Sequence, residues 1–308
     1  MTVDHTTFDG VFVPHVTPLT DDEEIDEQSL RQLIRELSAT AGLGGLASCT
    51  RVGEGPVLSY EEKLRVFEIV AEEAPDDMPR IGTVAPNSSA DAVEKIEGAA
   101  AAGADAVMVI PPLLFAWGEP SPEMRYRFFE QVDAETDVPI VLFQVPVESY
   151  WYEPDTLARI SHLDTVVAIK EASFNVKLFS DVVHTLQQEG GDISILSGND
   201  RFLAQSFMLG VQGALVGVAN VFPEEWVEMY DLARENRYNE ALDKQADLLE
   251  LKDLLFKRPI VTATSRIKWA LAAQDVIDGA TVRRPQPVIG DEETAELRTE
   301  LERRGAEL

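Results

Sequence analysis

Short apolar segments alternate with longer amphipathic segments along most of the chain. The apolar segments are rich in Val, Ile, Leu and Ala, and each is followed by apolar positions at helical spacing. This order is typical of parallel strands that are joined by helices. The predicted strands cover residues 10–16, 44–49, 80–84, 106–110, 138–144, 166–170, 193–196 and 213–218, and the predicted helices between them cover 28–41, 59–74, 88–102, 124–134, 155–160, 177–188, 201–209 and 224–235.

Eight strand–helix units follow one another without a linker or a change in composition. This number predicts a closed (β/α)8 barrel over residues 1–235. An open doubly wound sheet is the alternative, but no G-x-G-x-x-G motif follows the first strand. Residues 236–308 have a helical pattern over 239–255, 260–273 and 292–304, which predicts a C-terminal helical extension packed on the barrel as one structural unit.

The chain is strongly acidic. Asp and Glu number 55 against 26 Lys and Arg, which gives a net charge of −29. Nucleic acids and anionic membranes attract basic surfaces, so neither is an expected partner. We interpret the acidic surface as adaptation to a high-salt interior, and the alternative is an unusually acidic protein from an ordinary environment.

Cysteine content and hydropathy indicate in which cellular compartment the protein is expected. Cys49 is the only cysteine, so no disulfide within the chain is expected. Residues 1–9 are polar and show no apolar core of a signal peptide. No apolar run is long enough to cross a bilayer. We therefore expect a cytoplasmic protein.

Lys170 is the first candidate for chemistry because it ends the apolar run Val166–Ile169. In barrels of this type the functional residues lie at the carboxyl ends of the strands. Burial disfavours the ammonium form of a lysine, and a neutral amine is a nucleophile toward a carbonyl carbon. The alternative is a lysine whose head group reaches solvent along its own stem.

Other chemistries find little support. The four histidines show neither H-x-H nor H-E-x-x-H spacing, so no metal site is expected. No phosphate-binding loop and no G-x-S-x-G motif is present. An imine of Lys170 with a 2-oxo acid would itself serve as electron sink, so no cofactor is expected. His15 could face the barrel interior, although a packed, hydrogen-bonded role is favoured.

Four segments of the sequence are similar to the dihydrodipicolinate synthase and N-acetylneuraminate lyase family of Schiff-base aldolases. They are GVFVPHVTP at 10–18, GEGPVLSYEEK at 53–63, VVAIKEAS at 166–173, and SGND at 197–200 together with GALVGVANV at 213–221. The resemblance implies the barrel with its helical extension, Lys170 as the Schiff-base residue, and a homotetramer built as a dimer of dimers.

The sequence also departs from that family at several functional positions. Phe143 stands where the family carries its acid/base tyrosine, and Glu148 stands where the synthases carry an arginine. Thr50-Arg51-Val52-Gly53 replaces the family's segment with two threonines, and Leu113-Leu114, in the predicted loop 111–122, replaces its tyrosine pair. Arg51 is therefore expected to hold a carboxylate, and Tyr150, Tyr152, His15 or water to carry the proton.

These features lead to one principal hypothesis. We expect a Schiff-base lyase or aldolase that acts on pyruvate or a 2-keto-3-deoxy sugar acid, with Lys170 as nucleophile. The loop of Thr50, Arg51, Val52 and Gly53, together with Phe143 and the strand near Leu215, would bind the substrate. Alternatives are dihydrodipicolinate synthase proper, a dehydratase of the same family, and a 2-oxo acid binding or regulatory protein that has lost catalysis.

Overall fold

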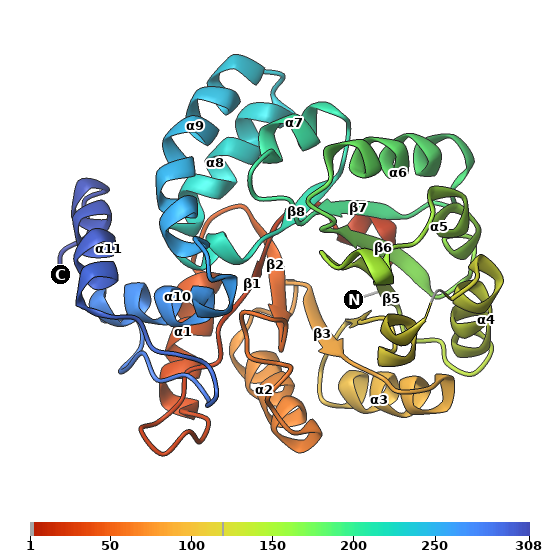
Figure 1. The fold of residues 1–308 in the computed structure, drawn as a ribbon, viewed down its shortest axis with the longest axis horizontal. Coiled ribbons are helices and arrows are strands. Elements are labelled where there is room, and N and C mark those ends of the chain that lie inside the picture. Colours follow the sequence, from red (N-terminus) through yellow and green to blue (C-terminus); the bar gives the residue numbers. More distant parts are fainter. Residues whose placement is uncertain (1–2, 119) are drawn as a thin grey trace.

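Eight parallel strands close into a barrel in the order β1 to β8, which confirms the predicted (β/α)8 fold (Figure 1). The computed structural model describes residues 3–118 and 120–308. Met1 and Thr2 of the polar segment 1–9, and Glu119 of the predicted loop 111–122, lie outside the described residues. The strands are β1 Gly10–Pro14, β2 Leu43–Ser48, β3 Arg80–Val84, β4 Ala106–Val109, β5 Ile140–Gln144, β6 Val166–Glu171, β7 Ser194–Ser197 and β8 Gly213–Leu215.

Helices follow the strands as predicted and surround the barrel (Figure 1). The predicted capping box is present: Glu62 N–H donates to Ser59 Oγ (3.1 Å) and Ser59 N–H donates to Glu62 Oε2 (2.7 Å). The helices of the barrel are α1 Glu27–Ser38, α2 Tyr60–Glu73, α3 Ser89–Ala101, α4 Pro122–Asp133, α5 Pro154–Ile160, α6 Val176–Glu189, α7 Leu203–Met208 and α8 Pro223–Arg234.

The last strand is shorter than predicted, because β8 ends at Leu215 and a 3-10 helix, η4, covers Gly217–Asn220. The hydrogen bonds of Asn220 explain this change. Its Nδ2 donates to the carbonyl oxygens of Gly217 and Pro14, both at 2.9 Å, while its Oδ1 accepts from Val16 N–H at 3.1 Å. The side chain thus takes the place of ladder hydrogen bonds and turns the chain away from the sheet.

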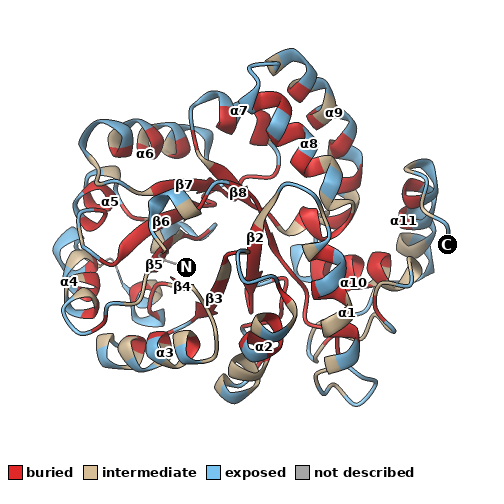
Figure 2. Ribbon diagram, turned by 180° about the vertical axis from the view of Figure 1, so that it is seen from behind, coloured by how far each residue is buried: buried red, intermediate tan, exposed pale blue. Residues whose placement is uncertain are grey.

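Two apolar layers explain why the strands are apolar on both faces. The smaller layer fills the barrel interior and includes Phe12, Met108, Val141, Leu196 and Leu215. The larger layer packs the outer face of the strands against the helices. Figure 2 shows the buried residues concentrated on the strands and on the inward faces of the helices. Alternation along a strand therefore decides which residues enter the interior.

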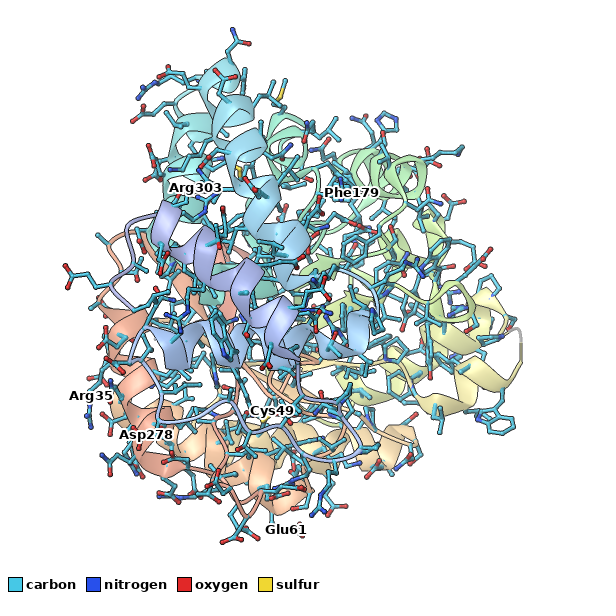
Figure 3. All side chains as sticks on the ribbon, turned by 60° about the vertical axis from the view of Figure 1, so that its left-hand side comes forward. Arg35, Cys49, Glu61, Phe179, Asp278 and Arg303 are labelled. Atoms are coloured by element: carbon cyan, nitrogen blue, oxygen red, sulfur yellow. The ribbon has the colours of Figure 1, made fainter. Side chains whose placement is uncertain are left out.

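Three further helices, α9 Tyr238–Leu255, α10 Ala263–Ala273 and α11 Asp291–Arg303, form the C-terminal extension. Helix α9 packs on α7 and α8, and α11 packs on α9 and α10. Charged side chains cover the outside of the molecule, as Arg35 on α1 and Glu61 on α2 illustrate in Figure 3. Across the described part of the chain, no helix combines the length and apolar character needed to cross a membrane.

Candidate active site

The amine of Lys170 belongs to the barrel interior. Ala168 on the same strand lies in the interior layer and Ile169 lies in the outer layer. Val167 also joins the interior layer, because the register with β5 shifts at this residue. Side chains alternate from Ala168 onward, so Lys170 points inward and Glu171 points outward. Glu171 accordingly accepts a hydrogen bond from Asn199 Nδ2 (2.6 Å) outside the interior layer. The nucleophile predicted from the sequence thus lies at the carboxyl end of its strand, inside the mouth of the barrel.

Phe143 and Gly198 lie beside the Lys170 side chain. Its Nζ lies 4.7 Å from the ring centroid of Phe143, its register partner on β5. A Cβ at Gly198 would lie 3.2 Å from Lys170 Cε, so the glycine leaves room for the lysine stem. Burial, reinforced by the positive charge of Arg51, lowers the pKa of Lys170 to about 7, although the negative charge of Asp200 opposes the shift. A large share of the amine is therefore neutral and nucleophilic near pH 7.

The loop after β2 presents Thr50 and Arg51 at the same end of the barrel. Its tight path requires unusual backbone angles, with φ of 56° at Cys49 and 59° at Glu54. Thr17 Oγ1 donates to the carbonyl oxygen of Gly53 at 2.8 Å, which ties the loop to the segment after β1. A Cβ at Gly53 would lie 2.8 Å from the carbonyl oxygen of His15, so only glycine permits this approach.

Two side chains of this loop suit an anionic ligand. Thr50 is buried, and its Oγ1 has no hydrogen-bond partner within residues 3–118 and 120–308. Arg51 donates from Nη1 to the carbonyl oxygen of Ile260 (3.2 Å) and stacks on the ring of Phe256. A buried hydroxyl that lacks a partner among the described residues, followed in the chain by a guanidinium, can contribute to carboxylate binding.

The C-terminal extension holds this loop in place. Glu54 forms a fully buried ion pair with Lys268 of α10, and its Oε1 accepts from Arg283 N–H (2.8 Å) and Gln286 Nε2 (2.7 Å). Lys268 also donates to the carbonyl oxygen of Thr281 at 2.7 Å. Sequence reasoning missed this contact, because a residue more than two hundred positions away supplies the partner.

The remaining predicted binding residues take different positions. Leu215 lies in the interior layer, together with Phe143, where both can wall the space around Lys170. Val52 belongs to the outer layer and packs toward Gly217, so only its backbone can face a ligand. The binding roles of these residues stay predictions.

Asp200 is a further functional candidate, which sequence reasoning left without a role. It follows β7 in the S-G-N-D segment and is 4% exposed. Its Oδ1 lies 3.8 Å from Lys252 Nζ of α9 and accepts no hydrogen bond from any residue that the structure describes. Its place three residues after the end of β7 makes it a strand-end candidate in the sequence, but that position alone assigns it no role. No group of three or more His, Cys, Asp or Glu among the described residues could hold a metal ion.

Comparison with known proteins identifies the family of this chain. The model of the dihydrodipicolinate synthetase family matches residues 7–304. The chain belongs to the dihydrodipicolinate synthetase family. A 4-hydroxy-tetrahydrodipicolinate synthase of Methanothrix thermoacetophila is 33% identical over 297 residues, which cover 96% of each chain. A second synthase of this name, from Pelobacter propionicus, is 30% identical over 293 residues, with 94% of this chain and 96% of its own covered.

Solved structures of the family show the same architecture. A dihydrodipicolinate synthase described as the first monomeric variant superposes with a TM-score of 0.90 at 26% identity, covering 98% of this chain and 99% of its own. The enzyme of Thermotoga maritima gives a TM-score of 0.89 at 26% identity, with 98% and 100% covered. Members of this family are class I, Schiff-base-forming lyases, and the chain is an enzyme of this class with a small-molecule substrate.

Phe143 stands where the resemblance leads one to expect a tyrosine as proton carrier, and Tyr152, one suggested replacement, lies outside the barrel interior. Tyr152 is buried in the outer layer, where Arg125 lies over its ring, and Tyr150 packs against the same layer. Gln144 holds this segment in place, since it accepts from Tyr152 N–H (2.9 Å) and donates to the Tyr152 carbonyl oxygen (3.1 Å). The Tyr152 phenol is therefore enclosed in the outer layer, away from a ligand on Lys170, and the role of Tyr150 stays a prediction.

His15, the third suggested replacement, is fully buried and hydrogen-bonded. Its Nδ1 lies 2.9 Å from the Val16 carbonyl oxygen and its Nε2 lies 2.8 Å from Ser48 Oγ. Burial lowers the pKa of His15 to about 4, so the ring is neutral near pH 7, with Nδ1 donating and Nε2 accepting. The favoured interpretation of His15 as a packed structural residue agrees with these contacts.

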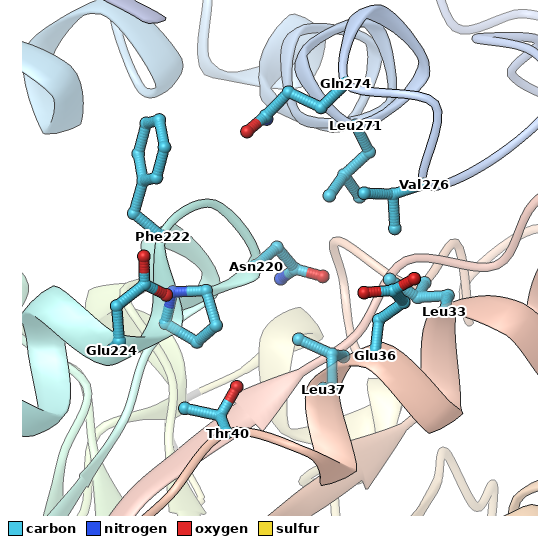
Figure 4. Close-up of a pocket in the computed structure, with 11 residues that line it drawn as sticks. Leu33, Glu36, Leu37, Thr40, Asn220, Phe222, Glu224, Leu271, Gln274 and Val276 are labelled. Carbon is cyan, nitrogen blue, oxygen red and sulfur yellow. The ribbon is translucent and has the colours of Figure 1, made fainter. Parts of the chain in front are cut away.

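The pocket drawn in Figure 4 is separate from these residues. It is a hollow of about 270 Å³ between α1, the start of α8 and α10. Leu33 and Leu37 of α1 and Leu271 of α10 form its apolar walls. None of the residues that surround Lys170 line it, so the pocket takes no part in chemistry at the Lys170 amine.

Proposed function

We propose that this enzyme forms an imine between Lys170 and a 2-oxo acid, and cleaves or forms a carbon–carbon bond next to the imine carbon. Pyruvate or a 2-keto-3-deoxy sugar acid is the proposed substrate class. The observation that carries the proposal is the buried amine of Lys170, whose pKa is lowered to about 7 inside the barrel mouth. An iminium at this position accepts the electron pair of the broken bond, so the reaction requires no cofactor.

The carboxylate of the 2-oxo acid would bind at the loop after β2. The groups proposed to hold it are the Thr50 hydroxyl, which has no hydrogen-bond partner in the described part of the chain, the Arg51 guanidinium, and the backbone of Val52 and Gly53. Phe143 and Leu215 would form the apolar walls that keep the Lys170 amine dehydrated. Charge-assisted hydrogen bonds to a guanidinium are among the stronger polar contacts, which supports this orientation.

Borohydride trapping tests the proposal. Incubation with pyruvate and sodium borohydride, followed by mass spectrometry of the peptides, is expected to show a reduced adduct on Lys170 and on no other lysine. The variant Lys170→Met should give no adduct, whereas Lys177→Met, which alters an exposed lysine on α6, should label like the wild type. Absence of an adduct over a panel of 2-oxo acids would instead favour a binding or regulatory protein.

A second candidate is 4-hydroxy-tetrahydrodipicolinate synthase activity, which the names of the curated relatives favour. Glu148 weighs against it, because this exposed carboxylate stands where the resemblance leads one to expect an arginine for the second substrate. Parallel assays for 4-hydroxy-tetrahydrodipicolinate formation, for pyruvate release from 2-keto-3-deoxy sugar acids and for their dehydration separate the synthase, the aldolase and the dehydratase.

We further infer a homotetrameric, cytoplasmic protein that is adapted to high salt. Three large apolar side chains of the 3-10 helix η2 (Leu113–Trp117) support an assembly: Leu113, Leu114 and Trp117 are 58%, 59% and 82% exposed. A monomeric variant exists among the solved relatives, so the state of this chain needs measurement. Light scattering should give four times the chain mass of 34.0 kDa, and a value equal to one chain would contradict the assembly.

A further inference from the structure

Asp200 has an open carboxylate oxygen in a place where water is largely excluded. Buried carboxylates normally have all their oxygens paired, and the exceptions call for an explanation. Here Oδ1 makes no hydrogen bond to any residue in the described part of the chain, and Lys252 Nζ at 3.8 Å is too distant to donate one. An oxygen left open in this way is available to a ligand.

The carboxylate of Asp200 shares its surroundings with the proposed nucleophile. Gly198, two residues earlier, lies against Lys170 Cε. The negative charge of Asp200 raises the pKa of the Lys170 amine, and the positive charge of Arg51 acts on both groups. A substrate joined to Lys170 and held at Arg51 would therefore lie beside Asp200.

The charges around Asp200 are mixed. Burial raises its pKa to about 6. Lys252, its own neighbour Arg201 and Arg51 lower that pKa, while Asp253 raises it. A carboxyl with a pKa near 6 can both accept and release a proton at neutral pH, which is the property that general acid/base catalysis needs.

We propose that Asp200 is the general acid/base of this enzyme and carries the protons that Phe143 cannot. The proposal rests on the proposed imine chemistry at Lys170. It assigns the function of the missing tyrosine to a side chain at the end of β7 rather than to Tyr150, Tyr152 or His15.

In the cleavage direction, the Asp200 carboxylate removes the proton from the hydroxyl at C4 of a 2-keto-3-deoxy acid bound as the iminium. The O–H electron pair forms the aldehyde, the C3–C4 bond breaks, and its electron pair forms the C2=C3 enamine and neutralises the nitrogen. Asp200 then returns the proton to C3, which restores the iminium. One water hydrolyses this iminium to the 2-oxo acid and the ammonium form of Lys170, which releases to solvent the proton that imine formation had taken up.

The C3 step can be tested with pyruvate alone. In deuterium oxide, enamine formation exchanges the methyl protons of pyruvate, and proton NMR follows the loss of the methyl signal. Asp200→Asn keeps the size of the side chain but cannot serve as an acid or base. Exchange at saturating pyruvate should fall about 10²- to 10⁴-fold, while borohydride trapping at Lys170 persists.

Asp253→Asn is the matched control, because Asp253 also pairs with Lys252 but is 50% exposed at its side chain. Its exchange rate should stay within threefold of the wild type. Exchange within threefold of the wild type in Asp200→Asn would overturn the proposal, and so would a rise in KM for pyruvate with an unchanged maximal rate. Failure of the wild type to trap pyruvate would refute the imine chemistry itself and is a distinct result.

If Asp200→Asn does not fold, the variant Lys252→Met provides a second test of the acid/base role of Asp200. Loss of the Lys252 charge removes a group that lowers the pKa of Asp200. The acidic limb of the exchange rate at saturating pyruvate should then move to higher pH. A limb that stays at the wild-type position would overturn the role of Asp200.

Discussion

Burial of the Lys170 amine should lower the stability of the fold, and Lys170→Met should restore it. The pKa of this amine is about 7 in the folded chain against an ordinary 10.5. Between these values the unfolded chain binds more protons than the folded chain, so the free energy of unfolding rises with pH. The destabilisation is complete below pH 7 and disappears as the pH approaches 10.5.

The size of the effect follows from the shift. One pKa unit corresponds to about 1.4 kcal/mol, so the shift destabilises the folded chain by about 5 kcal/mol at pH 6 and about 2 kcal/mol at pH 9. Methionine has a similar length and no charge. The free energy of unfolding of Lys170→Met should therefore exceed that of the wild type by these amounts, reduced by a pH-independent loss of the contact between Lys170 and Phe143. The gain should therefore shrink by about 3 kcal/mol from pH 6 to pH 9.

Urea unfolding at fixed salt, followed by tryptophan fluorescence at pH 6 and pH 9, measures this difference. Lys177→Met is the control, because the Lys177 side chain is 85% exposed and loses little hydration on folding. The free energy of unfolding of Lys177→Met should differ little from that of the wild type at both pH values. A Lys170→Met gain that is the same at pH 6 and pH 9 would refute the lowered pKa, and with it the neutral amine.

Four further outcomes follow from the structure. Arg51→Ala should raise KM for pyruvate about tenfold or more without loss of trapping at saturation, because it removes a charge-assisted contact with the carboxylate, and an unchanged KM would remove Arg51 from the binding site. Glu54→Gln should lower the free energy of unfolding by about 3–5 kcal/mol in urea, since it leaves the charge of Lys268 buried without an anionic partner, and a loss below about 1 kcal/mol would contradict that ion pair. In the wild type, kcat/KM should fall below about pH 7 as Lys170 of the free enzyme gains a proton, and a flat profile down to pH 5 would contradict the assignment. With a net charge of −29, the midpoint of thermal unfolding should rise between 0.2 and about 2 M KCl as salt screens the repulsion, whereas a constant midpoint would argue against adaptation to salt.

The sequence predicts the barrel well because each strand is short, apolar and followed by an amphipathic helix. Such a pattern is local, and capping residues such as Ser59 fix helix starts to within a residue or two. The same pattern cannot say which face of a doubly buried strand points inward. Val166–Ile169 is apolar throughout, so the inward direction of Lys170 depends on the register of β6 with β5 and β7.

The suggested proton carrier Tyr152 shows the limit of strand-end reasoning. It follows β5 closely in sequence, yet the Gln144 side chain pairs with the Tyr152 backbone and the phenol lies in the outer layer. Contacts between the site and residues distant in sequence cannot be predicted from the sequence pattern either. Lys252 and Ile260 reach Asp200 and Arg51 from the C-terminal extension, and no local pattern in that extension indicates these partners.

One physical cause, the exclusion of water from the barrel mouth, acts on two groups in opposite directions. It lowers the pKa of the Lys170 amine to about 7 and raises that of the Asp200 carboxyl to about 6. The negative charge of Asp200 also moderates the shift of Lys170, since it favours the ammonium form of the amine. A neutral nucleophile and a carboxyl that exchanges protons can therefore coexist near pH 7 without a tyrosine at position 143. An apolar phenylalanine suits this arrangement, because a hydroxyl there would bring water and hydrogen bonds back to the amine and weaken the dehydration on which both shifts depend.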